Sequence, residues 1–550
     1  MDMNYRKKFK KRYMVLSGFI VIIFICLTLR LYYLQIYSYD ELSSKAINQR
    51  GEEISLDPKR GIIFDRNRVP LTNNEIVQIA IVERSYVESN TELFNELRNN
   101  TLLSVEEFYK LIDSKERLLK IPLKDDNLLK KHKNNLFIVN TIHRYDKNNL
   151  LSHVIGYTNR SDNTGQAGIE KIYDEYLRKN DQNSFIVEYD RSRSLILDGD
   201  YYVNQNIDSY EPSGVKLTID YRIQSVIEEI MDEKEVDGAV IVTEADSGEI
   251  LGMASRPNYD QEKVEKSHSS KNMAFYNKAI GVGYPPGSVF KVVVLLAALE
   301  EEPDILDNNY FCKGYEEVNG NKPTKCSGQH GWISIEEGFA VSCNSVFIQI
   351  AKQIGGEKII DTAKKVGFGD KINIGLLEEK EGNLPNKEEV KGAEIGNIAI
   401  GQGALDVTPL QISNLMSIIV NKGIKKPISL VKGITNKDGY MIKDIILDEE
   451  EQIISKESAK YAQDLLGSVV TKGTAKSIDL QDIGGAGGKT GSAEAVLNGK
   501  SVVHGWFSGF FPFDNPEYTI SVLIEDSNLG SRDATPIFEE IVKEIYYLNR

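Results

Sequence analysis

Three short motifs in the second half of the chain carry hydroxyl, amine and amide side chains suited to acyl transfer. In the first, Tyr284-Pro285-Pro286-Gly287-Ser288-Val289-Phe290-Lys291 leads into an apolar helical run at Val292–Leu299. Pro-Pro-Gly predicts a turn into a helix, where residues three apart are neighbours, so Lys291 should lie beside Ser288. A serine becomes a nucleophile when a base accepts its proton, and an amine of lowered pKa can be that base. Alone, this spacing is also typical of an ordinary helix cap and a solvated lysine.

The second and third motifs would complete such a site. Ser342-Cys343-Asn344 precedes the apolar run Val346–Ile350, and its hydroxyl and amide could relay a proton and hold the lysine in place. Lys489-Thr490-Gly491-Ser492 follows two glycines and precedes a predicted hairpin of strands at Gly505–Phe511 and Tyr518–Ile524. Each motif alone is equally typical of a helix start or a glycine-rich loop. The prediction of a catalytic site therefore depends on their joint occurrence.

Two of the four cysteines lie close to a histidine between the first two motifs. Cys312, Cys326 and His330 have the spacing C-x13-C-x3-H. Two thiolates and an imidazole supply three of the four ligands of a tetrahedral zinc ion, and Asp304 or Asp307 could supply the fourth. A pair of cysteines outside the cytoplasm usually forms a disulfide instead. A structural zinc site, a Cys312–Cys326 disulfide and free thiols are therefore three open alternatives.

The N-terminal residues predict a membrane anchor that places these motifs outside the cytoplasm. Residues 1–12 carry six basic side chains and one acidic one, and residues 13–29 carry no charge. An apolar run of this length, extended to residue 36 past Arg30, is long enough to span a bilayer. Basic residues before the span favour a cytoplasmic N-terminus, and no small-residue cleavage site follows. We predict a cytoplasmic tail at 1–12, an uncleaved single-pass anchor at 13–36 and an extracytoplasmic remainder.

The remainder divides into two predicted domains. Residues 37–212 are polar with short apolar runs, and Ser209–Gly214 has the proline and glycine of a linker. Residues 213–550 contain short β-branched runs and end in Pro536–Leu548, whose apolar residues share one helical face and should pack on a sheet. The chain has 66 basic and 81 acidic residues, a net charge of −15, which argues against a nucleic-acid-binding protein.

In this order, the three motifs resemble the S-x-x-K, S-x-N and K-T-G signature of the penicillin-binding protein and serine β-lactamase superfamily. Further segments resemble the class B, or monofunctional, penicillin-binding proteins, and this resemblance runs from the anchor nearly to the C-terminus. The segments are Arg60–Asn67, His153–Tyr157, Gly168–Glu170, Leu217–Asp220 with Gln224, Gly401–Gly403, Thr408–Gln411 and His504–Phe507. Arg68 departs from a usual glycine, and Ser492 departs from a common threonine.

The resemblance implies a D,D-transpeptidase that cross-links peptidoglycan stem peptides and is inhibited by β-lactams. The implied fold is α+β: a transmembrane helix, an extended pedestal domain at 37–212 and a transpeptidase domain at 213–550. The transpeptidase domain would have a central antiparallel sheet, helices on both faces and an all-helical subdomain. The implied chemistry has Ser288 as the nucleophile, Lys291 as the base and Ser342 as the proton relay. Asn344 would hold Lys291 and a substrate amide, Lys489 would supply positive charge, Thr490 would bind the substrate carboxylate, and Gly491 would leave the strand edge open. The backbone N–H groups of Ser288 and Ser492 would form the oxyanion hole.

The resemblance implies no cofactor for catalysis, so any zinc would be structural. The implied partners are the membrane, stem peptides, β-lactams, a membrane glycosyltransferase and proteins of division, elongation or sporulation. A D,D-carboxypeptidase and a β-lactam-hydrolysing relative are alternatives, as is a non-catalytic β-lactam sensor or cell-wall assembly scaffold. The segment Glu379–Pro385 lacks the E-x-x-L-N pattern of class A β-lactamases, which disfavours hydrolysis, and the intact motifs disfavour a scaffold.

Overall fold

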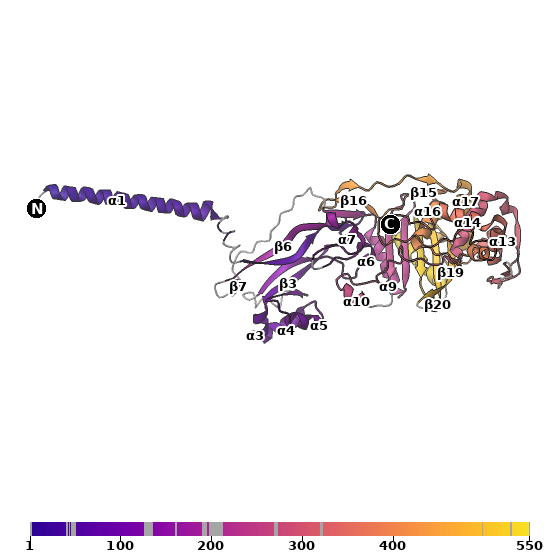
Figure 1. The fold of residues 1–550 in the computed structure, drawn as a ribbon, viewed down its shortest axis with the longest axis horizontal. Helices are drawn as coiled ribbons and strands as arrows, with labels where there is room; N and C mark the ends of the chain where they lie inside the picture. Colours follow the sequence, from indigo (N-terminus) through magenta and orange to yellow (C-terminus); the bar gives the residue numbers. More distant parts are fainter. Residues whose placement is uncertain are drawn as a thin grey trace. The chain divides into compact units, whose positions relative to one another are not determined.

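The computed structural model describes most of the chain as two compact units (Figure 1). The described residues are 3–39, 42, 45, 51–125, 136–159, 162–189, 195–196, 213–268, 273–318, 323–497, 499–527 and 531–548. Unit 1 comprises Met1–Lys59, Ile76–Ile142 and Asn180–Ile207, and unit 2 comprises Arg60–Glu75, His143–Lys179 and Asp208–Arg550. Most of the predicted linker at Ser209–Gly214 lies outside the described residues, and the predicted domain boundaries stay predictions.

The predicted anchor is a helix. α1 (Met3–Tyr32) continues into a π-helical turn at Tyr33–Tyr37, and its apolar side chains are exposed. Within the described part of the chain, Lys7–Tyr37 is the single helix long and apolar enough to cross a membrane. A long apolar helix with no buried face fits a membrane anchor.

Unit 1 contains a three-stranded sheet, in the order β4-β3-β5, that packs against short helices. Its core includes Ala80 and Val82 of the central strand and Leu93 and Phe108 of the helices. A second sheet has the order β1-β6-β7. The elements are β1 (Gly51–Arg60), β3 (Glu75–Glu83), α3 (Arg84–Ser89), α4 (Thr91–Asn100), α5 (Val105–Ile112), β4 (Leu118–Leu123), β5 (Leu136–His143), β6 (Arg178–Tyr189) and β7 (Leu195–Ile196).

Unit 2 is built on a five-stranded antiparallel sheet in the order β10-β9-β21-β20-β19. Its strands are β9 (Gly238–Glu244), β10 (Ile250–Arg256), β19 (Gly487–Leu497), β20 (Lys500–Phe511) and β21 (Tyr518–Ile524). The predicted hairpin is therefore confirmed as β20 and β21. The third motif lies in β19, which is an edge strand of this sheet.

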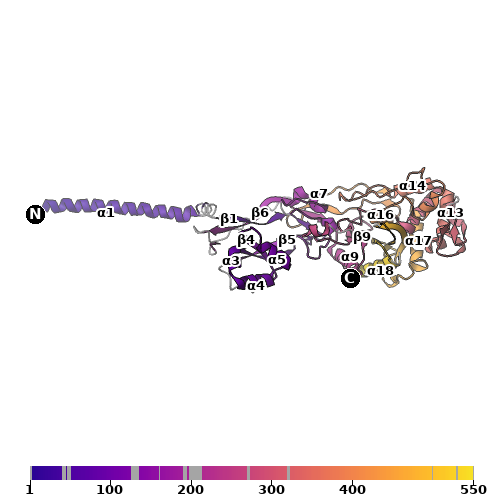
Figure 2. The same cartoon turned by 60° about the horizontal axis from the view of Figure 1, so that its bottom comes forward.

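Helices cover both faces of this sheet because side chains alternate across each strand. On one face, Phe507 packs against Phe538 of α18 (Ser531–Leu548), with ring centroids 4.5 Å apart. On the other face, Ser413 of α16 (Pro409–Val420) hydrogen-bonds Thr243 at 3.0 Å. Figure 2 shows α16 and α18 on the two sides of these strands. The predicted C-terminal helix is confirmed, because its apolar residues are buried at Ile537, Phe538, Ile541, Val542 and Ile545.

A second sheet of unit 2 joins an early segment of the chain to the C-terminal part. Its order is β17-β16-β8-β2, and β2 pairs with β8 in parallel. The strands are β2 (Ile62–Phe64), β8 (Gly214–Leu217), β16 (Val431–Thr435) and β17 (Met441–Asp444). Residues 60–75 consequently fold with unit 2, although they precede most of unit 1 in sequence.

The helical part of unit 2 surrounds α11 (Lys291–Glu301), whose first nine residues are all buried. A helix that is apolar all round lies either in a protein core or in a membrane, and the burial of α11 places it in the core. The remaining helices are α6 (Ser152–Ile155), α7 (Gly168–Ile172), α8 (Asp174–Leu177), α9 (Tyr221–Glu233), α10 (Val264–His268), α12 (Ile335–Ala340), α13 (Asn344–Ile354), α14 (Gly356–Lys365), α15 (Glu394–Ala399) and α17 (Lys456–Thr471). Short strand pairs are β11 (Asn309–Cys312) with β14 (Gly331–Ser334), β12 (Tyr315–Glu316) with β13 (Thr324–Lys325), and β15 (Ile424–Lys425) with β18 (Glu451–Gln452). The predicted α+β fold is confirmed.

Candidate active site

Ser288 lies in a 3₁₀ turn at Gly287–Phe290, directly before α11. The sequence predicts Ser288 in the first turn of the helix, and the structure places it in this tighter turn instead. Ser288 is half-buried, whereas Lys291 at the start of α11 is completely buried. Ser288 is thus partly exposed to solvent, while the Lys291 amine is removed from water.

The ammonium group of Lys291 connects the first motif to the second. Its Nζ donates to Asn344 Oδ1 at 2.6 Å, to the Ser342 carbonyl at 2.8 Å and to Ser342 Oγ at 3.2 Å. Burial lowers the pKa of Lys291 to about 8, because the interior disfavours the charged form. A large fraction of this amine is neutral near pH 8, as a general base requires.

Ser342 lies between two lysines in a strained backbone conformation. Its φ is +56°, in the left-handed region that non-glycine residues rarely adopt, and its hydroxyl accepts from Lys489 Nζ at 3.0 Å. The turn is held by Ser342 N–H donating to the Phe339 carbonyl at 3.1 Å. Burial and the nearby charge of Lys291 hold the pKa of Lys489 well below its usual value. The Ser342 hydroxyl can therefore exchange protons with either amine.

A second hydroxyl, from outside the three motifs, lies beside Thr490 of the third motif. Thr490 Oγ1 lies 2.6 Å from the hydroxyl of Thr474, a residue just after α17 that the sequence analysis did not identify. Gly491 lies close to the turn that carries Ser288, because a Cβ there would be 3.0 Å from the Pro286 carbonyl oxygen. The two hydroxyls make a polar end to the site, and the close approach explains the glycine.

The loop before the second motif supports Asn344. The Asn344 amide donates from Nδ2 to the Lys325 carbonyl at 2.8 Å, while its Oδ1 accepts from Lys291. The orientation of this amide is thus defined from both ends. Lys325 immediately precedes Cys326, so the loop that carries the cysteines reaches the second motif.

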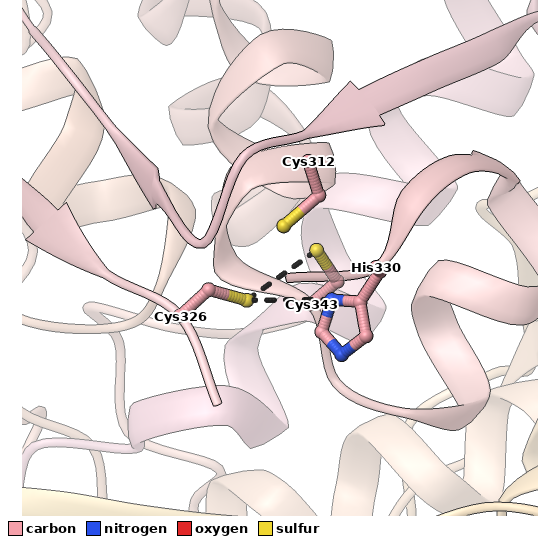
Figure 3. Close-up of side chains that lie close together, drawn as sticks. All are labelled: Cys312, Cys326, His330 and Cys343. Atoms are coloured by element: carbon pink, nitrogen blue, oxygen red, sulfur yellow. Dashed lines mark hydrogen bonds between the residues drawn. The ribbon is translucent and has the colours of Figure 1, made fainter. Parts of the chain in front are cut away.

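Four possible metal ligands meet next to Asn344 (Figure 3). The ligand atoms of Cys312, Cys326, His330 and Cys343 all lie within 4.8 Å of one another. Cys326 Sγ is 3.5 Å from Cys343 Sγ and 3.7 Å from His330 Nδ1. The sulfur–sulfur contact lowers the pKa of Cys326, which favours its thiolate form.

The composition of this cluster differs from the predicted one in its fourth member. Asp304 or Asp307 was expected as the fourth ligand, but the structure places Cys343 of the second motif there, and neither aspartate belongs to the cluster. All the cysteines are free thiols in the structure, with no Cys312–Cys326 bond. Three sulfurs and one imidazole nitrogen are a complete tetrahedral donor set for zinc. The available signal in the sequence was that Cys343 is a third cysteine outside the anchor, close after Cys312, Cys326 and His330.

The carboxylate of Glu379 is engaged by its own loop. It is buried and accepts backbone N–H groups from Ile372, Asn373 and Ile374. A carboxylate with these partners stabilises the loop and is poorly placed to activate a water molecule. This observation agrees with the absence of the class A β-lactamase pattern in the same segment.

Comparisons with known proteins match both parts of the chain. A family model described as penicillin binding protein transpeptidase domain matches residues 238–543, and one described as penicillin-binding protein dimerisation domain matches residues 55–196. Stage V sporulation protein D of Bacillus subtilis is 30% identical over 566 residues, which cover 97% of this chain and 85% of the relative. The peptidoglycan D,D-transpeptidase MrdA of Acinetobacter baumannii is 26% identical over 607 residues, which cover 98% of this chain and 88% of the relative.

A solved structure shares the fold. In the complex between penicillin-binding protein PBP2 and MreC from Helicobacter pylori, the matching chain has a TM-score of 0.64 and 22% identity. The match covers 90% of this chain and 99% of that one. At this identity the likeness is one of fold.

Proposed function

The chain belongs to the class B penicillin-binding proteins, and from this premise we propose that it is a peptidoglycan D,D-transpeptidase acting through a serine acyl-enzyme. The observation that supports the proposal best is the hydrogen bonding of Lys291. This buried amine of lowered pKa follows Ser288 by one helical turn and is held by Ser342 and Asn344. These groups are the parts that an activated serine needs.

In the acylation step, Ser288 Oγ attacks the carbonyl carbon of the penultimate D-alanine of a stem peptide. Lys291 accepts the hydroxyl proton, and the negative charge on the carbonyl oxygen is held by the backbone N–H groups of Ser288 and Ser492. The C–N bond then breaks as Ser342 passes a proton to the departing amine of the terminal D-alanine, and Ser342 takes up in its place the proton that Lys291 received from Ser288. The product is an ester between the shortened stem and Ser288.

In the second step, an amine from a neighbouring stem attacks the ester. The new peptide bond forms, the Ser288 oxygen leaves as a hydroxyl and the amine loses its proton to the Lys291–Ser342 pair. The peptide can lie along β19, because an edge strand offers unpaired backbone groups for strand addition. Thr490, Thr474 and the charge of Lys489 would hold the terminal carboxylate.

The membrane and partner assignments extend the proposal. The basic residues in the first turns of α1, before its apolar run, support a cytoplasmic N-terminus and an extracytoplasmic catalytic unit. A membrane glycosyltransferase is the proposed partner, together with proteins of division, elongation or sporulation. The relative from H. pylori was solved in complex with MreC, which supports a role of this kind of protein in larger assemblies.

We also propose that Cys312, Cys326, His330 and Cys343 hold a structural zinc ion. Bound zinc would fix the loop whose Lys325 carbonyl accepts from Asn344, and no catalytic step involves it. Purified full-length protein is expected to contain about one zinc ion per chain. Cys326→Ser should lose the metal, whereas Cys26→Ser, a control in α1, should keep it. Protein without zinc would exclude the proposal, as would a disulfide in this cluster found by mass spectrometry.

A fluorescent penicillin tests the acyl-enzyme. The wild type should form a stable covalent adduct and Ser288→Ala should form none, whereas stable labelling of Ser288→Ala would contradict the assignment.

Product analysis with stem peptides separates the alternatives: a cross-linked dimer indicates a transpeptidase, and a shortened monomer alone indicates a carboxypeptidase. Steady turnover of a chromogenic cephalosporin would indicate a β-lactamase.

A further inference from the structure

A group of buried side chains lies behind the Ser288 turn, and the proposed chemistry does not use it. It consists of Trp506 on β20, Tyr284 before the turn, Glu525 after β21, and Lys278. Each is at most 8% exposed, and Trp506 belongs to a segment that carries the family resemblance. We call these four residues the Trp506 bracket. All of them lie in unit 2.

Trp506 links the strand of the third motif to the turn of the first. It pairs with Gly491 across the β19–β20 ladder, and its indole Nε1–H donates to the Pro285 carbonyl at 3.0 Å. The strand leaves little room at this point, because a Cβ on Gly491 would lie 3.1 Å from Trp506 Cβ. A side chain of β20, the partner strand of β19, thus hydrogen-bonds the backbone of Pro285, three residues before Ser288.

Tyr284 lies directly before the same turn and contacts Trp506. Its ring lies edge-on to Trp506, with centroids 6.4 Å apart, and its hydroxyl donates to Glu525 Oε1 at 2.6 Å. Glu525 forms a buried ion pair with Lys278. The backbone of Tyr284 is fixed too, because it exchanges two hydrogen bonds with Val407, of 2.9 and 2.8 Å.

The turn also packs directly on β19. A Cβ on Gly287 would lie 2.8 Å from the Ser492 carbonyl oxygen, so the residues before Ser288 touch the residue that follows Gly491. Gly287 N–H donates to the Gly401 carbonyl at 2.9 Å on a further side. The distance between the turn and the strand is therefore determined by contacts that include the Trp506–Pro285 hydrogen bond.

We propose that the Trp506 bracket consists of positioning residues that hold the Ser288 turn at a fixed distance from β19, and that the rate of acylation depends on it. This inference rests on the proposed function, in which one oxyanion donor lies on the turn and the other on the strand. Displacement by about 1 Å at a reacting centre can reduce a rate by about 10²-fold. Binding of the substrate along β19 does not require the same precision.

The first test compares Trp506→Phe with a matched control in the same protein. The chain has two tryptophans, and the other one, Trp332, is 71% exposed on β14, so Trp332→Phe is the control. Stopped-flow labelling of the full chain with a fluorescent penicillin separates the acylation constant from the dissociation constant. Trp506→Phe should reduce the acylation constant about tenfold and change the dissociation constant less than about twofold. Trp332→Phe should change neither.

The second test uses Tyr284→Phe, which keeps the ring and removes the bond to Glu525. Its exposed control is Tyr276→Phe. Because Tyr284 and Trp506 hold the same turn, the double variant should lose less acylation than the product of the two single losses. Tyr284→Phe also tests the proposal if Trp506→Phe does not fold, and it should reduce the acylation constant about threefold.

The outcomes separate this inference from the proposed function. A wild type that is not labelled, or a labelled Ser288→Ala, contradicts the acyl-enzyme itself. Labelling of the wild type together with an unchanged acylation constant in folded Trp506→Phe, or in Tyr284→Phe, overturns the bracket alone. Losses that appear only in thermal stability or in the dissociation constant also overturn it, because they are the effects of a merely structural contact.

Discussion

The two turns that carry Ser288 and Ser342, the serines proposed to act in catalysis, are held by different kinds of contact. The Ser288 turn is held by buried aromatic rings, a buried ion pair and close glycine contacts. The turn at Ser342 has a strained backbone, and its motif is supported by a loop of free thiols and an imidazole that is partly exposed. The proposed nucleophile therefore has a buried, closely packed support, whereas the proposed proton relay lies next to a cluster of three free sulfur atoms and an imidazole. Lys291 is the side chain that connects the two.

Removing the Lys291 amine, and with it this connection, should have the largest effect on the rate of acylation. Lys291→Met keeps the length and the packing of the side chain but deletes the base and three hydrogen bonds. Loss of a positioned general base should reduce acylation by about 10²–10⁴-fold. The measurement is the rate of covalent labelling by penicillin. Thermal unfolding provides the control, since Met is tolerated in apolar surroundings. Acylation at the wild-type rate would show that another group is the base.

Protonation of Lys291 at low pH should have the next largest effect on the rate of acylation. Because burial lowers the pKa of Lys291 to about 8, the amine is protonated below that pH and cannot accept the Ser288 proton. Acylation should rise about tenfold per pH unit up to about pH 8 and then level off. The acylation constant measured from pH 6 to pH 10 checks this profile. A rate that is constant from pH 6 to pH 8 would contradict Lys291 as the base.

A change that touches neither turn should have the smallest effect. Thr474→Val removes one hydroxyl beside Thr490 and keeps the shape of the side chain. We expect a loss of about three- to tenfold in the affinity for a penicillin carboxylate, with little change in the acylation constant. Labelling at a series of penicillin concentrations measures both quantities. An effect confined to the acylation constant would show that Thr474 acts in the chemical step and not in substrate binding.

The sequence predicted the motifs better than their supports. Ser288, Lys291 and Lys489 were predicted as site residues because short spacings such as S-x-x-K correspond to local structure, and the structure brings Lys291 and Lys489 to the same hydroxyl of Ser342. Cys343 and Thr474 were missed as members of their clusters, because Cys343 was assigned to the second motif alone and Thr474 belongs to none of the three motifs; the fold brings their partners to them. The tight turn at Ser288 and the positive φ of Ser342 were missed for a related reason: tertiary packing imposes them. The α+β fold and the covered C-terminal helix were predictable because they follow from hydrophobic periodicity.

The most direct test of the account is the identity of the residue that a β-lactam acylates. After treatment of the full chain with penicillin, peptide mass spectrometry should locate one added penicilloyl group on Ser288. The same group should be absent from Ser288→Ala and should form much more slowly in Lys291→Met. An adduct on any other residue, or an adduct that forms as fast without Lys291, would contradict the acyl-enzyme mechanism.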